Sequence, residues 1–74
     1  MTQKQRILDY IKTFGGITAL EAMRDLGIMR LASRITDLGK DGIVIERSWV
    51  SDKNRYGEPV RYLRYYLPRE AKNG

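Results

Sequence analysis

The chain has 74 residues, which is enough for one domain with a single modest hydrophobic core. Its 14 lysine and arginine residues against 9 aspartate and glutamate residues give a net charge of +5, and its pI is near 9.8. Because the chain contains neither cysteine nor histidine, disulfide bonds, thiolate metal sites and a histidine general base are excluded. The basic balance favours an acidic polymer as partner, although many small soluble domains are mildly basic without one.

Other classes of protein are disfavoured by what the sequence lacks. No run approaches the roughly 18 apolar residues of a membrane span, and the N-terminal MTQKQR lacks the apolar stretch of a secretion signal. We therefore expect a soluble, cytoplasmic protein with no membrane partner. The sequence shows no nucleophile–base pair, no phosphate-cradling glycine loop and no ligand cluster, so we expect neither an enzyme nor a bound cofactor or metal.

The first predicted helix spans residues 3–14 and begins at a capping box. Thr2 can cap the helix while Gln5 reaches back to it. Gly15 and Gly16 end the helix, because glycine accepts the left-handed conformation of a helix end. The apolar stripe predicted to face the core is Ile7, Tyr10, Ile11 and Phe14.

A second helix is predicted over residues 19–26. Thr18 and Glu21 form its capping box, and Gly27 ends it. Ile28, in the turn that follows, is placed to be buried between this helix and the next. The residues predicted to face inward are Ala19, Ala22, Met23 and Leu26. Two short helices joined by a tight turn with glycine form the helix-turn-helix pattern, although the spacing also permits an αα-hairpin without a ligand.

The third predicted helix spans residues 29–41. Its apolar positions recur at i, i+4 and i+7 and are expected to face the core: Leu31, Ile35 and Leu38. Ala32 and Gly39 lie beside them and are small enough for a neighbouring element to approach closely.

Arg30, Ser33, Arg34 and Asp37 fall together on an outward flank of this helix. Two arginines one turn apart repel each other by a few tenths of a kcal/mol, roughly, in a lone helix, which favours a bound anion between them. The alternative is that Arg34 pairs with Asp37 and that the flank is merely solvated. The residues of this flank leave the two interpretations open.

After Gly42 the pattern changes period and predicts a β-hairpin. Residues 43–50 and 60–67 are rich in β-branched and aromatic side chains, and the turn formers of SDKNRYGEP separate them. Residues 68–74 are predicted to form a flexible polar tail.

The register of this hairpin is not determined by the sequence. One pairing places Glu46 opposite Arg64 and Val50 opposite Val60, but a bulge at Gly57 would shift it. A hairpin packed over three helices buries only one face, so some aromatic area, with Trp49 or Tyr66, is expected to stay uncovered.

At this point the chain resembles a winged helix-turn-helix domain. RLASRITDLGKDGIVIERSWV resembles that family's join of recognition helix to wing, and NRYGEPVRY resembles the wing tip of small winged-helix proteins encoded by bacteriophages and mobile elements of bacteria. The resemblance covers residues 3–67. It implies a single α+β domain over residues 1–74, a three-helix winged helix-turn-helix with a C-terminal β-hairpin wing. The family usually has a short strand between its first two helices, which only Ile17 is placed to supply here.

The resemblance also implies a double-stranded DNA partner. The third helix would lie in the major groove, and the wing would contact the flanking backbone. The implied recognition-helix residues are Met29, Arg30, Ser33, Arg34 and Asp37, and the implied wing and backbone contacts are Thr18, Lys53 and Arg55. Met29 is equally explained as a core edge, Asp37 as an intrahelical partner and Thr18 as an ordinary N-cap.

The implied function is a small phage-type transcriptional regulator in a bacterial cytoplasm. A protein-interaction module or inhibitor acting against an acidic protein is the main alternative, because winged helices also serve that purpose. RNA binding is a third, kept open by the tyrosine-rich second strand. A homodimer built partly on the hairpin or on the ends of the chain is expected, since two-fold dimers are the commonest soluble assembly.

Overall fold

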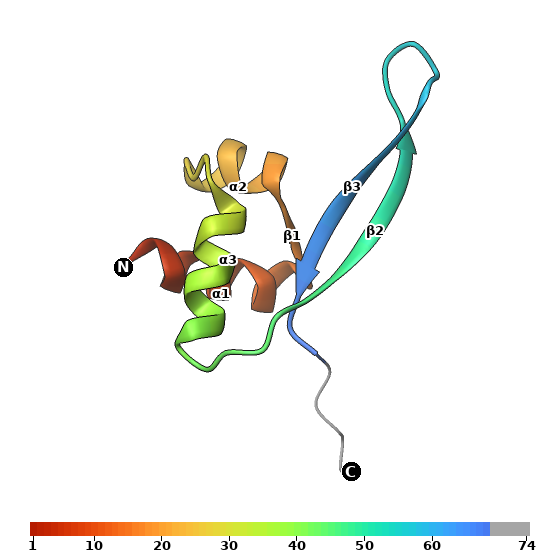
Figure 1. Cartoon of the computed structure of the whole chain (residues 1–74). Coiled ribbons are helices and arrows are strands. Elements are labelled where there is room, and N and C mark those ends of the chain that lie inside the picture. The colour runs from red at the N-terminus through yellow and green to blue at the C-terminus, as the bar shows by residue number, and fades with distance from the viewer. Residues whose placement is uncertain (69–74) are drawn as a thin grey trace.

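The computed structural model describes residues 1–68, in which three helices pack on one side of a three-stranded antiparallel sheet whose two long strands project beyond them (Figure 1). The elements in chain order are α1 (Gln3–Phe14), β1 (Ile17–Thr18), α2 (Ala19–Leu26), α3 (Leu31–Lys40), β2 (Glu46–Lys53) and β3 (Pro59–Tyr66). The predicted tail, apart from Pro68, lies outside the described residues. None of the described helices is long and apolar enough to cross a membrane.

Both predicted capping boxes are formed, and α1 and α2 have the predicted bounds. The Gln5 N–H donates to the Thr2 hydroxyl over 3.1 Å, and the Thr2 N–H donates to the Gln5 side chain over 2.9 Å. Thr18 and Glu21 exchange the same two hydrogen bonds. Each box satisfies N–H groups that a helix start leaves without partners, so local sequence suffices to place these two ends.

The third helix is shorter than predicted, because α3 begins only at Leu31 and ends at Lys40. After α2, the Ile28 N–H donates to the Ala22 carbonyl and the Ile28 side chain is buried, as expected. The chain then needs Met29 and Arg30 to turn into the new axis, and Arg30 takes a non-helical conformation with φ −121° and ψ 64°.

The short strand of the family is present. Ile17 and Thr18 form β1, which pairs antiparallel with β3 and completes a sheet of order β1-β3-β2. Ile17 lies opposite Tyr65, and both side chains are buried. This pairing attaches the base of the hairpin to the helices and leaves its outer half free.

The wing strands are displaced along the chain from the predicted ranges. β2 begins at Glu46 instead of residue 43, because the Ile43 N–H donates to the Leu38 carbonyl and so belongs to the end of α3. β2 also runs on to Lys53. The turn is confined to residues 54–58, where the Asn54 side chain accepts the N–H groups of Tyr56 and Glu58.

This turn also sets the register, which differs from the suggested pairing. Glu46 lies opposite Tyr66 and Val50 opposite Tyr62, so neither of the suggested pairs forms. The closed turn at Asn54 places Lys53 opposite Pro59. The shift is of two residues, and because side chains alternate with period two, each residue keeps the face that the suggested register gave it.

The core is a single cluster of apolar side chains beneath the sheet. Its buried members are Ile7, Ile11, Ile17, Ala22, Ile28, Leu31, Ile35, Leu38 and Tyr65. The prediction was wrong at the outer edges of α1 and α2, where Ala19 is exposed, Phe14 is 63% exposed and Met23 is 43% exposed. Phe14 instead packs its ring against that of Tyr10 at 4.6 Å, outside the cluster.

Candidate nucleic-acid interface

The outward flank of α3 contains the ion pair that sequence reasoning left as an alternative. Arg34 Nη1 lies 3.6 Å from Asp37 Oδ2, and each side chain is 38% exposed. An exposed pair at this distance contributes about 0–1 kcal/mol, so a phosphate or a base can displace the carboxylate at little cost. Ser33, one residue earlier, is half-buried.

The approach to α3 carries two exposed residues of the predicted set, Met29 and Arg30. Met29 is 74% exposed, which rules out its interpretation as a core edge. Arg30 is also exposed, and only its carbonyl takes part in the start of the helix, accepting the N–H groups of Ser33 and Arg34. Arg30 and Arg34 both line a hollow of about 290 Å³. Its lining residues are Gln3, Gly27, Ile28, Met29, Arg30 and Arg34.

One side of α3 is open where a neighbouring element was expected. Ala32 is exposed, and a Cβ added at Gly39 would meet nothing within 4 Å. The expectation of close packing here was wrong, because the hairpin joins the helices through Tyr65 and Ile17, at the far end of the core. The small side chains therefore leave the surface of α3 accessible to an external partner.

Thr18 is occupied by its capping role. Its side chain is 8% exposed, its hydroxyl accepts the Glu21 N–H, and its own N–H donates to the Glu21 carboxylate. The N–H groups that remain free of capping bonds at this end of α2 belong to Ala19 and Leu20, the first two helical residues.

Lys53 ends β2 and Arg55 lies in the turn that follows, at the tip of the hairpin that projects away from the helices (Figure 1). Both side chains are exposed, and neither forms an ion pair with any of residues 1–68. Asn54 between them is a turn residue, since its side chain holds the tip through Tyr56 and Glu58. The predicted contacts therefore form two separate sets, one on α3 and one on the wing.

Sequence reasoning missed a stacked pair on the wing strands. The Arg61 guanidinium carbon lies 4.7 Å from the centroid of the Trp49 ring, and the Trp49 side chain is 59% exposed. Trp49 lies diagonally across the hairpin from Arg61, so only the register brings the two together. Cations and aromatic side chains both occur along each strand, which indicates that such pairs can form. The sequence could not show which cation meets which ring, because that depends on the register.

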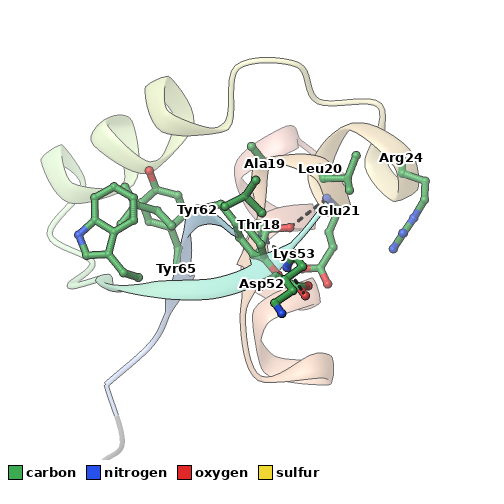
Figure 2. A pocket seen from close by; sticks show the side chains of 12 residues that line it. Thr18, Ala19, Leu20, Glu21, Arg24, Asp52, Lys53, Tyr62 and Tyr65 are labelled. Atoms are coloured by element: carbon green, nitrogen blue, oxygen red, sulfur yellow. Dashed lines mark hydrogen bonds between the residues drawn. The ribbon is translucent and has the colours of Figure 1, made fainter. Parts of the chain in front are cut away.

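A groove separates the first turn of α2 from the wing (Figure 2). Its volume is about 720 Å³. From β1 and α2 it is lined by Thr18, Ala19, Leu20, Glu21 and Arg24, and from the wing by Trp49, Asp52, Lys53, Val60, Tyr62, Leu63 and Tyr65. The groove is thus mainly apolar, with charged side chains at its margins.

The shifted pKa values of the described residues belong to one cluster that joins α1 and α2. The Arg24 guanidinium and the Tyr10 hydroxyl both donate to Asp25, and they lower the pKa of that carboxyl to about 2. The same hydrogen bond from Tyr10 raises the pKa of its phenol. Among residues 1–68, no group of three potential ligands is close enough to hold a metal ion.

A helix-turn-helix with exposed cations at its third helix, followed by a hairpin with cations of its own, defines the class of winged helix-turn-helix domains. A family model described as a winged helix-turn-helix domain matches residues 2–70, and the chain belongs to this family. Membership of this family suggests DNA binding. Comparisons with curated proteins and with solved structures gave no match.

Proposed function

We propose that this protein binds double-stranded DNA through α3 and the wing, and that it acts in the bacterial cytoplasm as a small phage-type transcriptional regulator. The observation that carries the proposal is the placement of Arg30 and Arg34 around one open hollow at the start of α3. Arginine contacts to guanine are the commonest specific contacts in the major groove, and the groove admits a helix presented in this way.

Each predicted contact residue on α3 and on the approach to it has a role within this proposal. Arg30 and Arg34 read guanine, and Met29 contacts a thymine methyl group. Ser33 binds a base or a phosphate, while Asp37 holds the Arg34 side chain until DNA replaces it. The net charge of +5 supplies the attraction to the duplex that does not depend on sequence.

The wing supplies contacts to the phosphates on either side of the base-reading site. Lys53 and Arg55 bind these phosphates from the tip. At the start of α2, Thr18 acts by holding the helix end, and the N–H groups of Ala19 and Leu20 face the backbone.

Fluorescence titration of a labelled duplex at low and at raised salt tests the proposal. Binding should weaken steeply with salt, since phosphate contacts release counterions. At a duplex selected for tight binding, Arg30→Ala or Arg34→Ala should each cost about 1–3 kcal/mol and relax base preference. Lys12→Ala is the matched control, because it removes an exposed cation from α1, on no proposed contact surface. If both α3 variants bind like the control, α3 is not the reading element.

The apolar groove beside α2 favours one second candidate, a module that binds an acidic protein. Leu20, Val60 and Tyr62 are exposed apolar side chains along this groove. The same titration separates the candidates, because a duplex that does not bind even at low salt would favour the protein partner.

A further inference from the structure

The register of the hairpin sorts its charges onto two faces. One face, which we call the inner wing face, carries Arg47, Trp49, Lys53 and Arg61, and it has three cations and no carboxylate. The opposite face carries Glu46, Asp52 and Arg64 among its residues. Alternation with period two produces this separation, so it holds along the full length of the strands.

The inner wing face lies on the same side of the sheet as the helices. Tyr65 belongs to this face and is buried in the core with its partner Ile17. Further along the strands toward the turn, the same face becomes exposed at Trp49 and Arg61. A DNA backbone that approaches the wing from the side of the helices would therefore meet this face.

The two arginines of this face each lie over an aromatic ring. Arg61 stacks on Trp49 at 4.7 Å, and Arg47 lies 5.8 Å from the ring centroid of Tyr65. Stacking orients a guanidinium while leaving its N–H edge free to bind a phosphate through two hydrogen bonds. Neither arginine forms an ion pair with any of residues 1–68.

Arg64, on the opposite face, is engaged differently. Its guanidinium donates to the Phe14 carbonyl at the end of α1 and lies across Gly16. The opposite face thus keeps its carboxylates and has its one cation occupied, which would repel a phosphate backbone. The contrast between the two faces is a difference in charge complementarity to DNA.

We infer that the inner wing face binds the phosphate backbone of the duplex held by α3, with Arg61 contacting a phosphate and Trp49 acting as its positioning residue. The inference rests on the proposed function and extends it, since it moves the main wing contact from the tip to the strands. The apolar groove beside Trp49 would otherwise suit a protein, but the cations of this face favour the backbone.

Trp49 is the single tryptophan of the chain, so its fluorescence reports on this face directly. Titration of the full chain with a duplex should change the Trp49 emission and protect it from quenching by acrylamide. Dilution of the protein without DNA should leave the emission unchanged. Emission that changes on dilution alone, and does not respond to a duplex that binds, would overturn the inference in favour of a second copy of the chain.

Variants of the pair separate the contact from its positioning. Arg61→Ala should weaken binding to every duplex and make the log–log salt slope shallower by about one unit. Trp49→Leu should weaken binding by about two- to fivefold with little change of slope, because the charge remains but its orientation is lost. Trp49→Phe, which keeps a ring, should restore most of the affinity. Far-UV circular dichroism checks that each variant folds.

The double variant tests whether Trp49 acts through Arg61. In the Arg61→Ala background, Trp49→Leu should have no further effect on affinity. If Arg61→Ala and Trp49→Leu both bind like Lys12→Ala while Arg30→Ala is impaired, the inference fails and the proposed function stands. A wild-type chain that binds no duplex would overturn both.

Discussion

Gly16 and Gly39 differ in the space that a side chain would find at each position. Gly16 is buried, and a Cβ there would lie 2.5 Å from the Arg64 guanidinium carbon. Gly39 lies in α3 with open space around it. The first glycine is required by a close approach, whereas the second only lowers the helix propensity of α3.

Gly16→Ala should destabilise the fold by about 1 kcal/mol, because Arg64 must leave the Phe14 carbonyl, 3.3 Å away, to make room. The added methyl group should cost nothing when Arg64→Ala is already present. Denaturation in urea measures both differences. A Gly16→Ala chain as stable as the wild type would show that Arg64 does not cross Gly16 in solution.

Gly39→Ala is the matched glycine substitution and should act in the opposite direction. Alanine in the interior of a helix is favoured over glycine by about 0.5–1 kcal/mol, and nothing here obstructs its Cβ. The same urea experiment should therefore show a gain. A loss would mean that a neighbour packs against this side of α3 after all.

The lowered pKa of the Asp25 carboxyl makes the stability of the fold depend on pH in the acid range. Its pKa is lowered to about 2 by Arg24 and Tyr10, from an ordinary value of 3.8. The unfolded chain therefore binds the proton more readily, so the contribution of Asp25 is complete above pH 4, roughly, and is lost as the pH falls to about 2. Asp25→Asn should show a smaller drop in Tm across this range than the wild type.

Thermal unfolding followed by circular dichroism at several pH values between about 5 and 2 measures this effect. Asp9→Asn makes the same change of charge at an exposed position of α1 and serves as the control. An acid-induced drop in Tm that is equal in Asp25→Asn and the wild type would contradict the role given to the Asp25 cluster.

Among the elements, the wing holds its cations in two different ways, one at the tip and one along the strands. The tip is held by the Asn54 side chain and presents Lys53 and Arg55 to solvent, while the strands hold their arginines on aromatic rings. The tip cations are therefore free to follow a phosphate, and those of the strands are oriented in advance.

Lys53→Ala and Arg55→Ala should each weaken binding to all duplexes alike. Each should also make the log–log salt slope shallower by about one unit, since one phosphate contact is lost. Competition among duplexes of different sequence, repeated over a range of salt concentrations, measures both quantities. A change in base preference with an unchanged slope would contradict the assignment to phosphates.

At the scale of the whole molecule, the exposed apolar side chains of the hairpin favour an assembly that covers them. Val60 is 37% exposed and Tyr62 is 39% exposed, and both lie on the face opposite Trp49. We expect a two-fold homodimer built partly on this face, which would place two copies of α3 on half-sites about one helical turn apart.

Sedimentation equilibrium over a wide range of concentration measures the assembly. The mass should approach twice 8.6 kDa at high concentration, and Tyr62→Asp should lower it by placing a charge in the interface. Arg61→Ala, on the other face, is the control and should leave the mass unchanged. A mass near 8.6 kDa throughout would end the dimer hypothesis.

The sequence by itself determined those features whose hydrogen bonds are local. The bounds of α1 and α2 follow from capping boxes that join residues three apart, and the change of period at Gly42 was enough to place the fold class. The pairing of Arg34 with Asp37 was also within reach of the sequence, because residues three apart on a helix are neighbours.

Only the tertiary structure decided the features that depend on contacts between distant residues. The start of α3 was set by the turn that Met29 and Arg30 must make after α2, and the register by the side chain of Asn54. The stack of Arg61 on Trp49 required that register, since a diagonal pair forms only when both strands are in place. Such contacts join residues far apart in the chain, and no local periodicity encodes their relative placement.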